Sequence, residues 1–473
     1  MSHATILWLR KAFRLADNPS LVAALEDGGP VIPVAILDDV VAGWGAAPRW
    51  RWGKALAAFA ETLEAHGSRL VLRRGDPLDS LRDLAKTTGA ERILWDRQYD
   101  AASKDRDAAV KAALEEDGLE ARSVAGHLMS EPWALETGSG GPYRVYSPFK
   151  NAFFDRADVG DPLAAPSDLA APDEWPESDD LATWALGADM NRGGEIVGLY
   201  ANIGEAAARS RLQRFLEQVD SYDEGRNRPD RDGTSDLSEN FAWGEISART
   251  VWHAVREHGS GKLSDGARTY LQELVWREFA YHLLHHYPGL PRENWRDKWD
   301  QFPWRDDNDD AERWRRGMTG LPFVDAALRQ LYATGRMHNR LRMLTGSVLT
   351  KHMLTHWRIG CRWFEECLID WDPASNSMGW QWVAGSGPDA TPFFRIFNPE
   401  TQRDKFDPQG DYVRRWVAEK AEGELGEDAL AFFRATPRSW GLSPDQEYPA
   451  PVVGLSAGRQ RALEAYEEVK KAS

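Results

Sequence analysis

The chain has 473 residues, of which 42% are hydrophobic and 28% charged, and its formal net charge is −16. This composition is typical of a soluble globular protein of about two to four domains, and no apolar run reaches the roughly 18 residues of a membrane span. The negative charge argues against nonspecific coating of nucleic acid, although it is compatible with a local basic face. The first residues lack a signal-peptide pattern, so we expect a cytoplasmic protein.

Short apolar runs alternate with helical stretches from Ala4 to about Ala125. This alternation predicts a Rossmann-like α/β domain, a parallel sheet covered by helices on both faces. A G-x-G-x-x-G turn is missing after the first strand, where residues 9–14 read LRKAFR, so this domain is not expected to hold a dinucleotide in the usual way. The expected strands are 6–9, 31–37, 70–72, 93–95 and 122–124, and the expected helices are 19–25, 51–66, 78–86 and 104–116.

The rest of the chain divides into a connector and a helical part. Residues from about 126 to 200 are rich in Pro, Gly, Asp and Ala, which is typical of a long surface connection. Helical periodicity dominates after residue 203. We therefore expect an α/β domain at 1–130, a connector at 131–200 and an all-α domain at 201–473. The expected helices of the last are 206–219, 248–258, 270–285, 324–333, 341–355 and 364–368.

The counts of cysteine and tryptophan limit the kinds of functional site that the chain can form. The two cysteines, Cys361 and Cys367, cannot form a four-cysteine zinc or iron-sulfur site, so we expect buried free thiols and no metal. The chain also has 22 tryptophans. A single indole usually belongs to the core, so only the arrangement of these residues points to a function.

Residues 334–382 combine arginines, carboxylates and indoles more densely than any other stretch. If the run 335–343 is helical, Asn339 and Arg342 share one face and Arg340 points elsewhere. Asp370 and Asp372 follow within plausible reach of the arginines. This combination suits a large, flat, charged aromatic ligand.

Two earlier segments have possible ligand-binding patterns. Residues 233–238 place hydroxyls and backbone amides ahead of a helical stretch, which suits phosphate oxygens, although a simple helix cap has the same pattern. Glu273 and Trp276 lie on one face of the next expected helix. A carboxyl group beside an indole can bond and stack a base, and the alternative is an ordinary surface pair.

Sequence blocks with specific spacing follow one another along nearly the whole chain. They are WLR at 8–10 with Asp17 and Asn18, TS-x-LS at 234–238, EL-x-WREF at 273–279, TG-x-P-x-VDAA at 319–327, MHNRLRM at 337–343, GWQW at 379–382 and RIFNP at 395–399. In content and order they resemble the photolyase/cryptochrome flavoproteins, and among these most closely the cyclobutane pyrimidine dimer (CPD) photolyases. The resemblance implies an N-terminal antenna domain and a C-terminal helical domain that holds FAD in a U shape. It also implies a monomer that acts on UV-damaged DNA.

The resemblance assigns residues to the cofactor. Arg342 would pair with Asp370 beside the flavin ring, and Asp372 would face the pyrimidine edge of the ring. Asn376 would lie near flavin N5, where a neutral amide stabilises a reduced ring without adding charge. The phosphates and ribose would be surrounded by Tyr222, Thr234, Ser235, Asp236, Leu237, Ser238 and Arg277.

It also assigns residues to damaged DNA. In the family a pyrimidine dimer is flipped out of the duplex, which is less costly for a poorly stacked dimer than for a normal base. Trp276 would stack on the dimer and Glu273 would hydrogen-bond its carbonyls, while an electron from light-excited reduced FAD opens the cyclobutane ring. The implied DNA contacts are Arg226, Glu273, Trp276, Asn339, Arg340, Met343, Arg395 and Gln402.

A chain of three tryptophans, Trp380, Trp357 and Trp304, is implied as the route that reduces oxidised flavin. Each of them could also be a core residue, and we assign Trp363 and Trp371 to the core. The family position favours an electron-transfer role for the first three.

Several residues depart from the family pattern. Arg336 stands where tryptophan is common, and Tyr270 stands where a larger indole is frequent. Ala12 replaces a common acidic residue, and residues 377–378 read SM in place of the usual Asn-Gly. Residues 102–103 and 291–292 do not reproduce the antenna site of one folate-binding branch. The antenna chromophore would therefore be a folate held in a different way from that branch, a deazaflavin or another flavin, or the domain would carry none.

Two other functions remain open at this point. A cryptochrome is a photoreceptor that signals through partners instead of repairing DNA. A (6-4) photolyase would have a His-His pair where this chain has His338 and Asn339. CPD repair is the leading hypothesis because Glu273, Trp276, Asn339 and Asn376 are all residues of the repair type.

Overall fold

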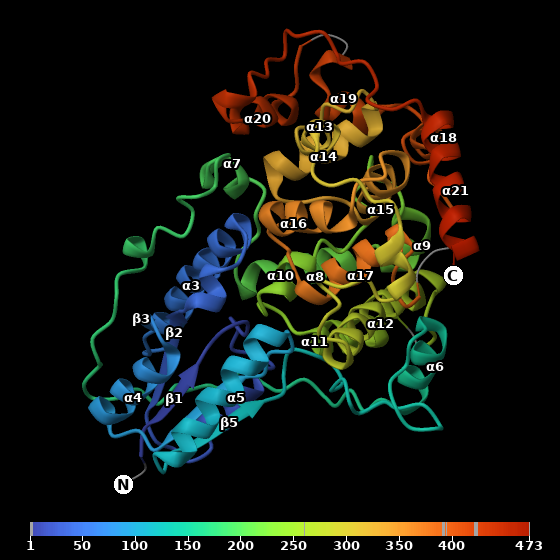
Figure 1. Ribbon diagram of the computed structural model, residues 1–473. Helices are drawn as coiled ribbons and strands as arrows, with labels where there is room; N and C mark the ends of the chain where they lie inside the picture. Colours follow the sequence, from blue (N-terminus) through green and yellow to red (C-terminus); the bar gives the residue numbers. More distant parts are fainter. Residues whose placement is uncertain (1–2, 260, 390–392, 394, 421–423, 473) are drawn as a thin grey trace.

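The N-terminal part of the molecule is built on a parallel β-sheet. A computed structural model describes residues 3–259, 261–389, 393, 395–420 and 424–472. The sheet has five strands in the order β3-β2-β1-β4-β5 (Figure 1), which confirms the predicted α/β layout. Predicted and observed strand ends differ by two residues at most. The strands are β1 (Thr5–Trp8), β2 (Val31–Leu37), β3 (Val71–Arg74), β4 (Arg92–Asp96) and β5 (Glu120–Val124).

Helices cover both faces of the sheet because successive side chains of a strand point to opposite sides. Leu7 of β1 packs in one buried cluster with Leu21 and Leu56, whereas its neighbour Trp8 packs in another with Leu81 and Leu114. The helices involved are α1 (Pro19–Leu25), α3 (Ala46–Ala65), α4 (Pro77–Thr88) and α5 (Ala101–Glu116), and a short α2 (Asp39–Ala42) precedes α3. The prediction of a two-sided sheet is confirmed.

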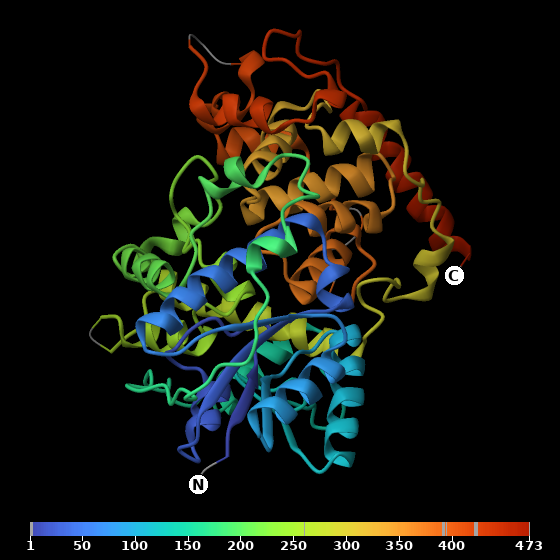
Figure 2. The same ribbon diagram turned by 90° about the vertical axis from the view of Figure 1, so that its left-hand side faces the viewer.

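A long connection leads from the sheet to the helical part. It follows the outside of the molecule (Figures 1 and 2) and includes two helices that composition did not predict, α6 (Tyr146–Arg156) and α7 (Gly194–Gly198). Phe149 and Phe153 of α6 are buried in one cluster with Leu271 and Phe279 of the long helix α12. Helix α6 of the connector is therefore packed into the core of the helical part.

The remainder of the chain is mainly helical, as predicted. Its helices are α8 (Glu205–Leu216), α9 (Tyr222–Gly225), α10 (Ser238–Ala242), α11 (Ala248–Glu257), α12 (Asp265–His286), α13 (Asp309–Arg315), α14 (Pro322–Thr334), α15 (Asn339–Ser347), α16 (Trp357–Cys367), α17 (Pro373–Ala384), α18 (Pro399–Phe406), α19 (Asp411–Trp416), α20 (Glu427–Ala435) and α21 (Leu455–Ala472). Among the described residues, no helix combines the length and the apolar character that a membrane span requires. Cys361 and Cys367 are buried free thiols, as expected.

Most helix boundaries differ from the predictions by a few residues, and three differences lie near residues of the expected site. The run 335–343 is helical only from Asn339, because Gly335 adopts a left-handed φ of 71° and ends α14. The stretch 341–355 is α15 followed by a turn of π-helix at Val348–His352. The segment 364–368 is the end of a longer helix that starts at Trp357. In each case local periodicity located the helix but not its ends.

Candidate functional site

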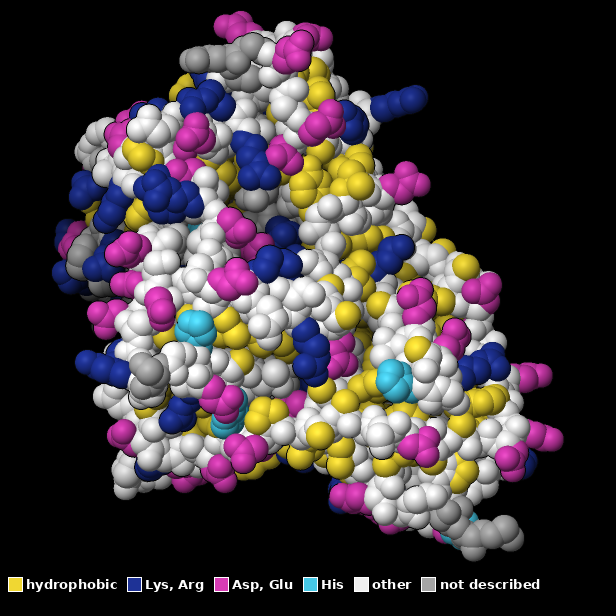
Figure 3. Space-filling model, turned by 180° about the vertical axis from the view of Figure 1, so that it is seen from behind, with side chains coloured by type: hydrophobic (Ala, Val, Ile, Leu, Met, Phe, Trp, Pro, Cys, Tyr) yellow, Lys and Arg dark blue, Asp and Glu magenta, His cyan; other side chains and the backbone are white. Residues whose placement is uncertain are grey.

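A cavity of about 880 Å³ opens in the helical part. Figure 3 shows the surface from behind, with Lys and Arg side chains gathered on the side where α18 and α21 lie in Figure 1. Predicted site residues from distant parts of the sequence line this cavity: Tyr222, Arg226, Thr234, Ser235, Asp236, Leu237, Ser238, Glu273, Trp276, Arg277, Asn339, Arg342, Met343, Asp370, Asp372, Asn376 and Trp380. Arg340 instead lines a neighbouring cavity of about 530 Å³, and Arg395, Gln402, Trp357 and Trp304 are outside the lining of both.

One wall is the loop Thr234–Ser238 in front of α10. The Thr234 hydroxyl donates to Asp236 Oδ1 at 3.1 Å, and Arg211 Nη1 donates to the Asp236 carbonyl at 2.7 Å. Asp236 has a left-handed φ of 55°, a conformation that Asp tolerates better than most residues. The loop is therefore held by side chains on both sides of its sharpest bend.

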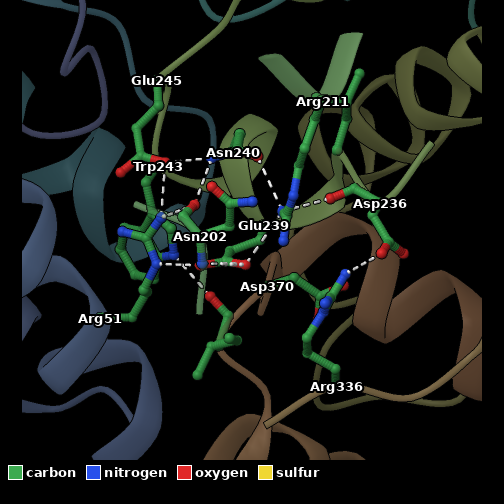
Figure 4. A network of polar contacts seen from close by, with 12 residues as sticks. Arg51, Asn202, Arg211, Asp236, Glu239, Asn240, Trp243, Glu245, Arg336 and Asp370 are labelled. Carbon is green, nitrogen blue, oxygen red and sulfur yellow. Dashed lines mark hydrogen bonds and ion pairs between the residues drawn. The ribbon is translucent and has the colours of Figure 1, made fainter. Parts of the chain in front are cut away.

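Arg336, which stands where tryptophan is common in related sequences, faces this loop. Its contact there explains the arginine in structural terms. Its Nη2 lies 2.7 Å from Asp236 Oδ2, as Figure 4 shows. Burial opposes ionisation of the carboxyl, but the guanidinium prevails and lowers the pKa of Asp236. An indole at this position could not form that ion pair.

A second arginine–carboxylate pair lines the cavity near Arg336. Arg342 Nη2 lies 2.7 Å from Asp370 Oδ2, and its Nε donates to the Met337 carbonyl at 2.8 Å. Beside it, His338 caps α15 by accepting from the Arg340 amide at 3.1 Å. Burial lowers the pKa of His338 to about 4, so its ring is neutral at pH 7. The sequence predicted the pair between Arg342 and Asp370, but it did not predict that His338 caps α15.

Asp372 lines the cavity at the start of α17. It caps α17 by accepting from the Ser375 amide at 2.8 Å, and it also accepts from the Tyr281 hydroxyl. That hydroxyl lies 2.8 Å from His127 Nε2, which in turn lies 2.8 Å from Arg277 Nη2. Burial lowers the pKa of His127 well below its usual value. This buried chain could not be found from sequence, because His127 is more than a hundred residues away from its partners.

Asn376 supplies a neutral amide on the first turns of α17. Its Nδ2 donates to the Cys361 carbonyl at 3.0 Å and contacts Cys361 Sγ at 3.3 Å. These contacts to α16 fix the amide at the cavity wall. The buried thiol therefore positions a polar group of the site.

On α12, Glu273 and Trp276 form the part of the wall that was predicted to meet a base. Arg226 Nη1 lies 2.7 Å from Glu273 Oε1. Burial raises the pKa of Glu273, and Arg226 opposes that shift. The indole of Trp276 stacks on Tyr146 of α6, with ring centroids 3.5 Å apart and planes 10° from parallel. Tyr146 thus fixes the plane of Trp276, a support that the sequence did not reveal.

Three indoles lead from the cavity toward the surface. Trp380 lines the cavity and packs directly on α16, where a Cβ on Gly360 would lie 2.0 Å from its ring. Trp357 is the first residue of the same helix and is fully buried. His356 connects it to the half-buried Trp304, with ring centroids 5.6 Å from Trp357 and 5.4 Å from Trp304. Trp380 thus packs on the helix that Trp357 begins, and His356 lies between Trp357 and Trp304; electron transfer through the three remains a prediction.

The cavity fits the expected FAD. Hydroxyls and arginines surround one region, which suits a diphosphate, and Asn376 and Asp372 line the same space. Within the described part of the chain, Asp370 Oδ1, His338 Nε2 and Trp380 Nε1 are buried without a hydrogen-bond partner. Buried polar atoms are normally paired, so these three atoms indicate a polar ligand in the cavity.

Comparison with known proteins gives matches over almost the whole chain. Residues 5–167 match the family model described as DNA photolyase, and residues 270–468 match the FAD binding domain of DNA photolyase. A deoxyribodipyrimidine photo-lyase from Agrobacterium fabrum is 45% identical over 98% of both chains. The crystal structure of a bacterial class III photolyase from Agrobacterium tumefaciens is 44% identical, with a TM-score of 0.91 over 100% of this chain and 98% of that one. A Synechocystis cryptochrome is 27% identical, with a TM-score of 0.84 over 98% of this chain and 100% of its own.

Proposed function

Because this chain belongs to the DNA photolyase family, we propose that it is a light-driven enzyme that binds FAD and splits cyclobutane pyrimidine dimers in DNA. One observation carries the proposal. A single cavity is lined both by the residues expected to hold the flavin and by Glu273 and Trp276, which are expected to receive the lesion. Electron donor and acceptor would then be in direct proximity, without a protein layer between them.

The chain's own groups would bind and orient the cofactor. Thr234, Ser235 and Ser238 supply hydroxyls for the diphosphate, and Arg342 with Asp370 forms a rigid polar edge for the flavin ring. Asn376 presents an amide without charge. When bound in its reduced form, FAD supplies the electron that opens the dimer on illumination.

The lesion would enter from the side of α12. Trp276, supported by Tyr146, offers a rigid face for a base, and stacking of this kind contributes about 1–3 kcal/mol per base. Arg226, Asn339, Met343 and, from the neighbouring cavity, Arg340 would meet the DNA around the lesion. For Arg395 and Gln402, a contact to the flanking strand remains a prediction.

The division into domains at 1–130, 131–200 and 201–473 is part of the proposal. The sheet of β1 to β5 supports the first boundary, and the packing of α6 on α12 ties the connector to the last domain. The monomeric state, the cytoplasmic location and the antenna chromophore remain predictions from the sequence.

The substrate is tested most simply by binding in the dark. The full-length protein is titrated with oligonucleotides that carry a thymine CPD, a (6-4) photoproduct or no lesion, at fixed salt. We expect the CPD oligonucleotide to bind at least tenfold more tightly than the other two. Preference for the (6-4) product would indicate the other repair class, and equal binding of all three would support a cryptochrome function.

Replacing Glu273 with Ala is expected to lower the yield of dimer splitting several-fold while FAD stays bound. Glu273 would hydrogen-bond a dimer carbonyl, and burial raises its pKa against the opposing charge of Arg226. Glu273→Gln retains an N–H donor and should recover part of the yield. The measurement is repaired oligonucleotide per absorbed photon, and a wild-type yield for Glu273→Ala would contradict the assigned role.

Replacing Trp380 with Phe is expected to slow photoreduction of oxidised flavin at least tenfold, because a phenyl ring is far harder to oxidise than an indole. Repair that starts from chemically reduced protein should change little. Trp363→Phe is the matched control, because Trp363 stacks on Tyr332 and does not line the cavity. Flavin absorbance is followed under blue light with an external reductant; photoreduction of Trp380→Phe at the wild-type rate would exclude Trp380 from the path.

A further inference from the structure

The loop Thr234–Ser238 contains an acidic residue where the ligand is expected to be most negative. Asp236 lines the cavity, and its side chain is 45% exposed to it and to solvent. Carboxylate and diphosphate repel each other, and the repulsion is strongest where water is partly excluded. A carboxylate in this loop therefore requires a compensating cation.

Arg336 supplies that cation from a rigid turn. Its backbone N–H donates to Thr334 Oγ1 at 3.0 Å. Gly335 packs so closely that a Cβ there would lie 2.6 Å from Ile369 Cγ2. The turn before Asn339 is thereby held against the segment that carries Asp370. From this base the guanidinium reaches Asp236 Oδ2 at 2.7 Å.

The other side of the loop is fixed by a separate buried network (Figure 4). Arg211 donates to the Asp236 carbonyl and also to Glu239 Oε2 at 3.3 Å. Glu239 accepts from Arg51 Nε of α3 at 2.7 Å, which connects the loop to the sheet domain. Arg211 therefore holds the backbone of the loop, whereas Arg336 holds its charged side chain.

We propose that Arg336 is a positioning residue for the cofactor: it neutralises Asp236 and turns that side chain away from the diphosphate, so that the hydroxyls of the loop can bind FAD. This inference rests on the proposed binding of FAD to this cavity. It explains why an arginine at 336 accompanies an aspartate at 236. Because Arg336 itself lines the cavity, the double variant distinguishes an arginine that acts through Asp236 from one that contacts the ligand directly.

The test compares release of FAD from the full-length protein and from the variants Arg336→Gln, Asp236→Asn and the double variant, by free-FAD fluorescence on serial dilution. Loss of a charge-assisted contact predicts at least about tenfold weaker retention in Arg336→Gln. Asp236→Asn should retain FAD as well as wild type or better, because it removes the repelling charge. The double variant should regain most of the affinity.

Arg434→Gln is the matched control, because Arg434 is an exposed arginine that pairs with Glu427 and does not line the cavity; it should leave FAD retention unchanged. Thermal unfolding of each variant without FAD reports any loss of folding. Wild-type retention in Arg336→Gln, or a double variant as weak as Arg336→Gln, would overturn the inference. A wild-type protein that binds no FAD would instead refute the proposed function.

Discussion

Asp370→Asn is expected to weaken FAD binding about 100-fold, the largest single effect on the cofactor. Asp370 has a side chain only 5% exposed and is paired with Arg342 at 2.7 Å. Without this carboxylate Arg342 is no longer held in the orientation in which it would contact the flavin edge, and a hydrogen bond to a charged group contributes about 1.5–3 kcal/mol. The upper end of that range is about a 100-fold change in affinity. The measurement is the equilibrium release of FAD from the full-length protein.

The control for this prediction is Asp404→Asn, which removes the carboxylate of an exposed pair with Arg403 outside the cavity. Exposed ion pairs contribute about 0–1 kcal/mol, so this variant should retain FAD nearly as wild type does. Equal FAD affinity for Asp370→Asn and wild type would show that the flavin ring does not rest on the Arg342–Asp370 edge.

Trp276→Ala is expected to have the largest effect on DNA. It should weaken binding of a CPD oligonucleotide about 10- to 100-fold and leave the FAD content unchanged. The indole is the exposed face of a two-ring stack with Tyr146, and the loss of one base-stacking surface costs about 1–3 kcal/mol. Fluorescence anisotropy in the dark measures this binding without any contribution from the photochemistry.

Two further variants test whether the effect depends on an aromatic ring at position 276. Trp276→Phe keeps a ring on Tyr146 and should recover most of the affinity. Trp133→Ala removes an indole that is 44% exposed and does not line the cavity, so CPD binding should be unaffected. If Trp276→Ala bound CPD DNA as tightly as wild type, the lesion would have to enter by another wall.

The fold was predictable because its elements follow local periodicity. The bounds of β2 and α1 were predicted correctly, and the two-sided sheet followed from alternating apolar runs. Pro373 begins α17, because a proline at the first helical position loses no hydrogen bond. Helix ends depended on single conformations such as the left-handed Gly335, which a pattern of apolar residues does not encode.

The candidate site was predictable only in part. Sequence blocks marked most of the cavity wall, but the contacts that orient those residues come from distant segments. Tyr146 supports Trp276, and Arg336 pairs with Asp236, across a hundred residues or more in each case. Such pairs depend on tertiary packing, and no local pattern indicates which two residues will meet. Arg336 was therefore recognised as unusual in the sequence and was explained only by the structure.

Light-dependent splitting of a defined CPD by the purified protein tests the central claim most directly. The full-length protein, with its flavin reduced, is mixed with an oligonucleotide that carries one thymine dimer and is illuminated with blue light, and the products are separated by chromatography. We predict conversion of the dimer to two intact thymines in the light and no conversion in the dark. An unchanged dimer after illumination, with reduced FAD bound and the oligonucleotide saturating, would contradict the proposed function.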